Sequence, residues 1–144
     1  FVYKAPRYDV CGGENLKLVN KYYLTDFGFK YYILNNPTVE LQQLVENVVY
    51  FELLRRRYKV STGKVDDKEV DFMIQGNDGR IRYVQVAVSV ADPDKLAQEL
   101  AVFSCIKDNY PKYLLTMDDV FVPDHNGVRT LNVIEYLLGK CELD

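Results

Sequence analysis

The sequence predicts an α/β fold in which a mixed β-sheet is flanked by helices and preceded by an N-terminal β-hairpin arm. Residues 68–89 are rich in Val, Ile, Phe and Tyr on either side of a Gly- and Asn-containing turn, as in a β-hairpin. Residues 38–57 carry apolar side chains at helical spacing. A helix at 92–106 then connects the hairpin to an apolar strand at 112–116, and such a crossover makes neighbouring strands parallel.

Composition describes a single globular domain and excludes several classes of protein. The 144 residues are 48% hydrophobic and 27% charged, which is ordinary for a domain of this size. A net charge of -3 gives no overall nucleic-acid signature, so such binding would need a local basic patch. No apolar run reaches 18 residues, and three scattered cysteines form no CxxC motif. With no signal peptide, we expect a cytoplasmic protein that does not bind membranes. The chain begins with Phe1 rather than Met, and we expect it to be a piece of a longer protein.

The N-terminal part, residues 1–36, is predicted to be a hairpin arm followed by a short helix. Residues 1–9 alternate weakly and contain Pro6, which is typical of an edge strand or an extended arm. Residues 16–24 form the second strand, and Thr25 and Asp26 can cap a helix that ends near Leu34. Residues 37–144 form the predicted α/β core. The arm is rich in tyrosine, at Tyr3, Tyr8, Tyr22, Tyr23, Tyr31 and Tyr32.

The core begins with the helix predicted at residues 38–57. Thr38 is the expected N-cap, and arginines occupy the last turn, where the helix dipole favours cations. Glu46 lies at the border of the apolar stripe, where it would either point into a cleft or be solvated. Further along, Asp92 is the expected N-cap of the crossover helix. The other elements are a strand at 58–62, a loop containing His125, a short strand at 128–130 and a closing helix at 131–138.

The central hairpin, residues 68–89, carries the first functional signal. With Gly79 in the left-handed conformation, residues whose numbers sum to 156 lie opposite each other, so Asp71 faces Gln85. Alternation places both on the face that also carries Met73, Tyr83 and Ala87. The opposite face is predicted to be core and carries Val70, Phe72, Ile74, Val84, Val86 and Val88.

A carboxylate opposite a carboxamide has two interpretations. Asp71 and the Gln85 side-chain oxygen, with the Val86 carbonyl nearby, could bind a hard cation such as Mg²⁺. Alternatively, they are polar residues on a wetter face of the sheet. The spacing alone favours the second interpretation.

The order of elements and several stretches together resemble a known superfamily. The stretches are YKAPRYDV, NKYYLTDFGFKYYIL, LVENVVYFELLRRRYKVSTGK, KEVDFMI, YVQVAVSVADP, KDNYPKYLLTMD and LNVIEYLL. Over nearly its whole length the chain resembles the C-terminal, PD-(D/E)XK nuclease-like domain of a large prokaryotic family of AAA+-type ATP-binding proteins. The resemblance implies a restriction-endonuclease-like sheet and an upstream ATPase module as partner. No GxxxxGK[ST] motif occurs here, so we expect no ATP site in this fragment.

The resemblance also implies a site, and this sequence departs from it at two positions. Glu46 is the helix carboxylate and Asp71 the metal-binding aspartate, whereas Gln85 replaces the second acidic residue and Ala87 the catalytic lysine. Losing one preorganised charge-stabilising group typically lowers the rate by about 10²–10³. We therefore expect a vestigial site in which Mg²⁺ binding is weak or lost. Lys64 or Lys68 could replace the lysine, although both are more simply solvated loop charges.

Three functions compete at this stage. The first is a nuclease-like accessory domain with a degenerate site that binds nucleic acid or a partner. A basic edge would support it, formed by Arg55, Arg56, Lys64 and Lys68 with Arg57 and Lys59. These arginines are also what a helix C-terminus prefers. The second is an active Mg²⁺-dependent deoxyribonuclease that uses Glu46, Asp71 and Gln85. The third is a protein-interaction or oligomerisation module that uses the Tyr-rich arm, which could equally pack over a local core.

Overall fold

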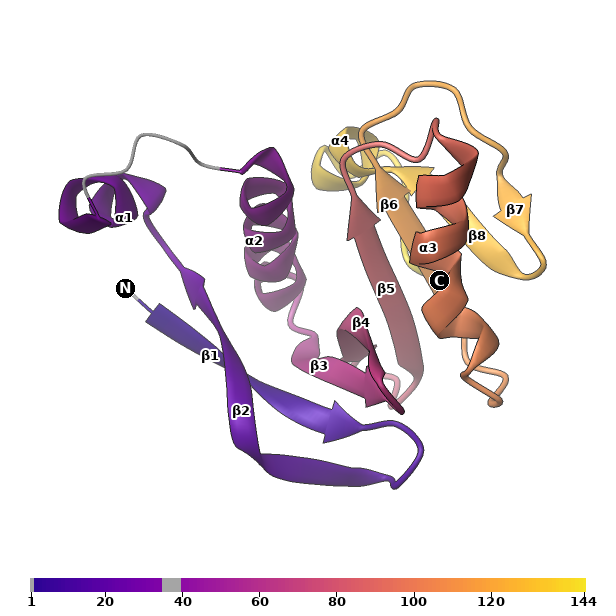
Figure 1. Ribbon diagram of the computed structural model, residues 1–144, viewed down its shortest axis with the longest axis horizontal. Coiled ribbons are helices and arrows are strands. Elements are labelled where there is room, and N and C mark those ends of the chain that lie inside the picture. The colour runs from indigo at the N-terminus through magenta and orange to yellow at the C-terminus, as the bar shows by residue number, and fades with distance from the viewer. Residues whose placement is uncertain (1, 35–39) are drawn as a thin grey trace.

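The computed structural model describes residues 2–34 and 40–144, which form a mixed α/β fold. Its strands are β1 (Val2–Asp9), β2 (Glu14–Leu24), β3 (Lys59–Val65), β4 (Lys68–Gln75), β5 (Ile81–Ala87), β6 (Lys112–Thr116), β7 (Asp124–His125) and β8 (Val128–Asn132). Its helices are α1 (Phe27–Leu34), α2 (Leu41–Arg55), α3 (Pro93–Ser104) and α4 (Val133–Leu137). Within the described residues the strands form one eight-stranded sheet in the order β2-β1-β3-β4-β5-β6-β8-β7 (Figure 1). None of the described helices has the length and apolarity that crossing a membrane would need.

The central hairpin has the predicted register. β4 and β5 pair antiparallel from Phe72 opposite Val84 to Gln75 opposite Ile81, and each pair sums to 156. Gly79 has a φ of 75°, the left-handed conformation that the turn requires. β5 lies at the centre of the sheet and pairs parallel with β6, as the crossover through α3 predicts.

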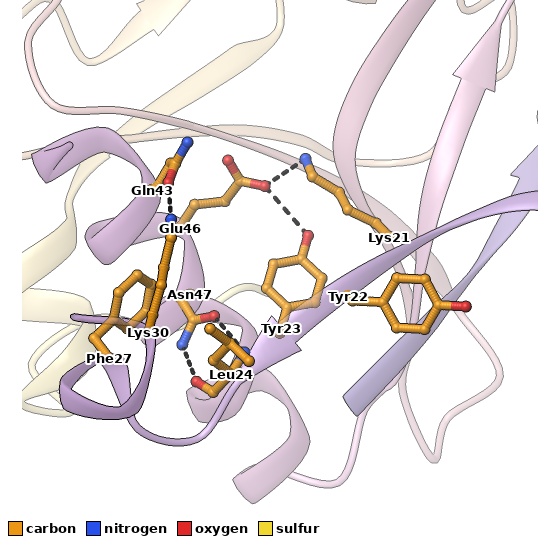
Figure 2. Close-up of a pocket in the computed structure, with 9 residues that line it drawn as sticks. All are labelled: Lys21, Tyr22, Tyr23, Leu24, Phe27, Lys30, Gln43, Glu46 and Asn47. Carbon is orange, nitrogen blue, oxygen red and sulfur yellow. Dashed lines mark hydrogen bonds and ion pairs between the residues drawn. The ribbon is translucent and has the colours of Figure 1, made fainter. Parts of the chain in front are cut away.

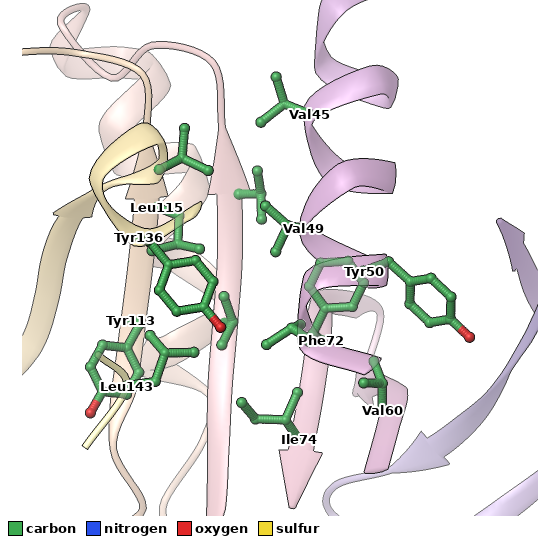
Figure 3. Close-up of a cluster of buried hydrophobic side chains, with 14 of the residues drawn as sticks. Val45, Val49, Tyr50, Val60, Phe72, Ile74, Tyr113, Leu115, Tyr136 and Leu143 are labelled. Atoms are coloured by element: carbon green, nitrogen blue, oxygen red, sulfur yellow. The ribbon is translucent and has the colours of Figure 1, made fainter. Parts of the chain in front are cut away.

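Two hydrophobic layers cover the sheet. α2 and α4 lie on one face, where Val45 and Val49 pack with Phe72, Leu115 and Tyr136 (Figure 3). α3 lies on the other face, and its Val102 and Phe103 belong to a second buried cluster. A fully buried side chain of this size contributes about 1.5–3 kcal/mol. The helices and strands that carry Glu46, Asp71 and Gln85 are therefore fixed by hydrophobic packing on both faces of the sheet.

A β-bulge in β4 changes the predicted alternation. The register with β3 shifts between Ser61 and Gly63, so that Asp71 and Phe72 both lie opposite Thr62. A bulge adds one residue to one strand and re-aims the side chains next to it.

The prediction that Val70 shares a face with Phe72 is therefore wrong. Val70 packs in the α3-side cluster with Met73 and Tyr83. Phe72, Ile74, Val84 and Val86 occupy the α2 side, and Val88 packs against them, as predicted.

The N-terminal hairpin extends the sheet, and its first strand is not at the edge. β1 lies between β2 and β3, so the prediction of an edge strand is wrong, and β2 forms the edge. β1 pairs with β3 only over Arg7 to Asp9, and its register with β2 shifts between Ala5 and Arg7. Pro6 lies at this shift, where its missing N–H group does the least harm to the ladder. On the Ala5 side of the shift the hairpin packs against the helical layer, and Ala5 and Tyr23 are buried there.

Helix starts follow the predicted capping with one difference. The Asp26 side chain accepts from the Gly28 N–H at 2.7 Å, and Asp92 accepts from the Asp94 N–H at 2.9 Å. α2 begins at Leu41 after Glu40, whose side chain makes no cap hydrogen bond. The predicted cap Thr38 lies outside the described residues.

The C-terminal region differs in detail from the prediction. His125 belongs to the two-residue strand β7, which pairs antiparallel with β8 rather than lying in a loop. β8 continues to Asn132, whose side chain accepts from the Glu135 N–H at 3.0 Å and caps α4. The strand is therefore longer and the helix shorter than predicted.

The bulge predicts a stability effect at Gly63. A Cβ atom there would overlap Cγ1 of Val70 and approach Cγ2 of Val10 to 3.3 Å. We expect Gly63→Ala to lower the free energy of unfolding by about 1–3 kcal/mol, because the bulge has no space for a methyl group. Urea unfolding measures this. Ser61→Ala on the same strand should change stability by less than about 0.5 kcal/mol, and a Gly63→Ala variant as stable as wild type would contradict the account.

Candidate functional site

A lysine from the arm lies close to three carboxylates that come from α2 and β4. The Nζ atom of Lys21 in β2 lies 2.5 Å from Oε1 of Glu46, 3.5 Å from Oε1 of Glu69 and 3.9 Å from Oδ1 of Asp71. The Glu46 and Asp71 side chains are only 13% and 15% exposed. Lys21 is therefore the cation closest to two acidic side chains that are largely removed from water.

The end of β2 is fixed to α2, and this places Lys21. The Asn47 side chain accepts from the Leu24 N–H at 3.0 Å and donates to the Leu24 carbonyl at 2.6 Å. The Tyr23 hydroxyl donates to Oε1 of Glu46 at 3.2 Å, and its ring stacks on Tyr50 with centroids 3.9 Å apart. In Figure 2, Lys21 and Tyr23 both reach Glu46 from the strand side.

A cavity of about 290 Å³ opens beside Glu46 on the arm side. It is lined by Lys21, Tyr22, Tyr23, Leu24, Phe27, Lys30, Gln43, Glu46 and Asn47 (Figure 2). Its second lysine, Lys30, donates to Oε1 of Gln43 at 2.9 Å rather than to a carboxylate. Lys30 therefore lines the cavity without pairing with the buried acids.

Asp71 is held where the β4–β5 backbone ladder ends. Its Oδ2 accepts from the Val86 N–H at 2.9 Å, and its own N–H donates to Oε1 of Gln85 at 3.0 Å. Two side chains thus satisfy backbone groups that ladder pairing would otherwise satisfy. The Asp71 carboxyl group and the Gln85 carboxamide oxygen are therefore held in position by the backbone of the neighbouring strand.

Gln85 turns to the other side of the sheet. Its Nε2 donates to Oε2 of Glu99 in α3 at 2.9 Å, and Oε1 of Glu99 pairs with Lys95 at 2.6 Å. Gln85 and Glu99 line a separate cavity of about 330 Å³. The predicted arrangement, with Asp71 and Gln85 facing each other on one side, therefore differs from the structure, because the bulge re-aims Asp71 toward Lys21 and Glu46.

The oxygens expected to bind Mg²⁺ already accept hydrogen bonds within the protein. Oε1 of Gln85 is bound by the Asp71 N–H, and the Val86 carbonyl accepts from Nε2 of Gln42 at 2.7 Å. Oε1 of Glu46 is bound by Lys21 and Tyr23. Among the described residues, no three His, Cys, Asp or Glu side chains are arranged to hold a metal ion. The residues present do not fit the metal that the resemblance implies, because an ammonium group lies beside the carboxylates that would bind it.

The pKa values of Asp71, Lys21 and Tyr23 are shifted because these side chains are buried and because the acidic groups around Lys21 outnumber it. Burial raises the pKa of Asp71 to about 8, with a further contribution from Glu46, against the opposing effects of Lys21 and the Val86 N–H. Burial lowers the pKa of Lys21, but Glu46 and Asp71 together outweigh it, so the net shift is upward and the ammonium form is held. Burial and the Glu46 charge raise the pKa of Tyr23, which stays a neutral donor.

The other predicted residues lie outside this cluster. Ala87 is fully buried in the α3-side core and leaves no place for a charge. Lys68 lines the α3-side cavity with Gln85. Within the described part of the chain, neither Lys64 nor Lys68 forms an ion pair with Glu46 or Asp71. The structure therefore brings Glu46 and Asp71 together around Lys21, with Gln85 attached through the Asp71 backbone.

The arginines at the end of α2 are committed to local partners. Arg55 and Arg56 both pair with Glu52, and Arg56 also reaches Glu142 and the Tyr136 carbonyl, at 2.6 and 2.7 Å. Arg56 is 13% exposed, so it acts as a structural ion. Arg55 lies nine residues from Glu46, about 13 Å along the helix axis. The predicted basic edge is thus compensated at this end, and its nucleic-acid role stays a prediction.

Three residues of the site were not identified from the sequence. Lys21 and Tyr23 lie in the stretch NKYYLTDFGFKYYIL, where alternation places both on one face of a strand. Glu99 follows Lys95 by one helical turn, the usual spacing of an ion pair. No local pattern indicates that either group reaches the central hairpin.

The arm tyrosines divide between packing and exposure. Tyr23 is buried, and Tyr3 packs edge-to-face on Phe51 with ring centroids 5.2 Å apart. Tyr22 and Tyr32 are exposed, and the side chain of Tyr31 lies outside the described residues. Core packing thus accounts for part of the tyrosine content.

Comparison with known proteins identifies a relative without a described function. The chain is 36% identical over 136 residues to an uncharacterised protein of Haemophilus influenzae. The match covers 94% of this chain, and the chain spans about a third of the length of that relative. No family model and no solved structure matches the chain.

The raised pKa of Asp71 predicts a pH effect on stability. An unfolded Asp has a pKa of about 3.9, so between pH 4 and pH 8 the folded protein binds more protons at this group. The contribution of Asp71 to stability therefore falls as pH rises through that window. We expect Asp71→Asn to gain stability relative to wild type from pH 4 to pH 8, by on the order of a few kcal/mol. Urea unfolding of both proteins at several pH values measures this difference, and a pH-independent difference would contradict it.

Proposed function

We propose that the chain is a PD-(D/E)XK nuclease-like accessory domain of a longer AAA+-type ATP-binding protein, in which Lys21 has taken the place of the catalytic metal. The proposed fold is restriction-endonuclease-like. The order α2, β3, β4, β5, α3, β6 supports it, since three antiparallel strands precede a crossover to a parallel strand. The length of the Haemophilus relative supports the longer protein.

The position of Lys21 carries the proposal. A divalent metal in a nuclease polarises the phosphate and lowers the pKa of bound water. An ammonium ion has one charge and no vacant coordination position, so Lys21 pairs with Glu46 beside Asp71 without supplying this chemistry. Gln85 and Ala87 remove two further charges that such a site would use.

A site that lacks metal chemistry does not cleave nucleic acid, so the role that we propose for the domain is binding. The cavity beside Glu46 retains Lys30 and the aromatic side chains Tyr22 and Phe27. Cations and aromatic rings are the groups that bind single-stranded nucleic acid. The proposed binding of nucleic acid or a protein partner therefore uses the arm side of the molecule.

One observation favours a second function. The Lys21 ammonium lies 3.9 Å from Asp71, so it could replace the lysine that is missing at Ala87. The chain would then be an active Mg²⁺-dependent deoxyribonuclease. The two functions differ in whether Lys21 competes with a metal or assists it.

Calorimetric titration with Mn²⁺ separates them. We expect wild type to bind Mn²⁺ with a Kd weaker than about 1 mM, because Lys21 compensates the carboxylates. Lys21→Met should bind more tightly than wild type, and the double variant Lys21→Met/Asp71→Asn should lose this gain. Lys30→Met, in the same cavity but without a carboxylate partner, and Lys21→Arg should behave like wild type.

A cleavage assay with Mg²⁺ on single- and double-stranded DNA completes the test. The proposal predicts no cleavage by wild type above the level of Asp71→Asn. Cleavage that requires Asp71 and is abolished in Lys21→Met would overturn it and establish the nuclease.

A further inference from the structure

Helix α2 is apolar on two sides. Its inner stripe, Val45, Val49 and Leu53, is buried against the sheet. An outer stripe of Leu41, Leu44, Val48 and Phe51 follows the same helical spacing, and Leu41 and Val48 are 48% and 42% exposed. A helix that is apolar around most of its circumference is normally covered on both sides. The described part of the chain buries the inner side and covers the outer side only in part, where the Tyr3 ring packs on Phe51.

The outer stripe forms the wall of a groove. A cavity of about 520 Å³ is lined by Leu44, Val48 and Phe51 of α2, with Phe27 of α1 and Leu137 of α4 at its sides. Exposed apolar Ile134 of α4 and Leu138 directly after it add to the same helical layer of the molecule.

The charges on the rim do not favour a nucleic acid. Glu52 and Arg55 lie there and form an ion pair at 2.7 Å. A surface that binds the phosphate backbone needs uncompensated cations. An apolar groove with a compensated polar rim is instead typical of contacts between domains of one protein.

We infer that this groove is the docking surface for the remaining part of the longer protein, which under the proposed function is its ATPase module. The chain spans about a third of its Haemophilus relative, so most of that protein is available to cover the groove. The start of β1 lies beside it, since the Tyr3 ring contacts Phe51 and Val2 is exposed. A segment preceding Val2 would therefore enter the domain next to the groove.

Covalent side-chain footprinting of the 144-residue chain and of the full-length protein tests the inference. Labelling of Leu44, Val48 and Phe51 should fall several-fold in the full-length protein, while Tyr110 and Val120, in connections away from the groove, keep their labelling. Val48→Asp in the full-length protein should restore labelling of Phe51. Val120→Asp, the same change at a position that is 90% exposed, should not.

Each outcome has one meaning. Equal labelling in both proteins would overturn the inference. Protection that arises in the 144-residue chain on raising its concentration would also overturn it, because the occupant would then be a second copy. A full-length protein without an ATPase module would refute the proposed function, whereas the footprint would still decide whether the groove is covered from within the same chain.

Discussion

The ion cluster of Lys21 with Glu46 and Asp71 is the interaction on which the arrangement of this domain depends. Two carboxylates lie between a helix and a sheet with little access to water, and an uncompensated charge in such a place is strongly destabilising. The neighbouring cation, Lys21, comes from β2, fifty residues before Asp71 in the sequence. The arm is therefore a structural part of the core, and the Tyr23–Tyr50 stack and the Asn47–Leu24 hydrogen bonds hold it in position.

The bulge in β4 determines which side of the sheet the Asp71 side chain reaches. By placing Asp71 and Phe72 opposite one residue of β3, it directs the Asp71 carboxylate toward the arm while Gln85 remains on the α3 side. Two ion clusters result, one on each face of the sheet: Lys21–Glu46–Asp71 and Lys95–Glu99 with Gln85. The bond from the Asp71 N–H to Gln85 joins them. Metal ligation from both strands would require this bond to open.

The elements predictable from the sequence are those fixed by local chemistry. The conformation of Gly79 set the hairpin register, and Asp26 and Asp92 marked the helix starts, because turn and cap preferences act within a few residues. The convergence of Glu46 and Asp71 was implied by the resemblance and not by spacing. The internal position of β1 and the role of Lys21 were missed, because each depends on contact between segments about fifty residues apart. The bulge at Asp71 was missed because alternation within β4 does not show how that strand pairs with β3. Pro6 indicated an edge strand, but it lies at a register shift where an internal strand tolerates it.

The most direct test of the central claim is a crystal structure of the chain soaked with Mn²⁺, with anomalous difference maps around Asp71. If Lys21 is the resident cation, its ammonium will remain on Glu46 and no manganese peak will lie within coordination distance of Asp71. A manganese ion bound to Asp71 and Glu46, with Lys21 displaced into the neighbouring cavity, would contradict the account and restore the metal-dependent site.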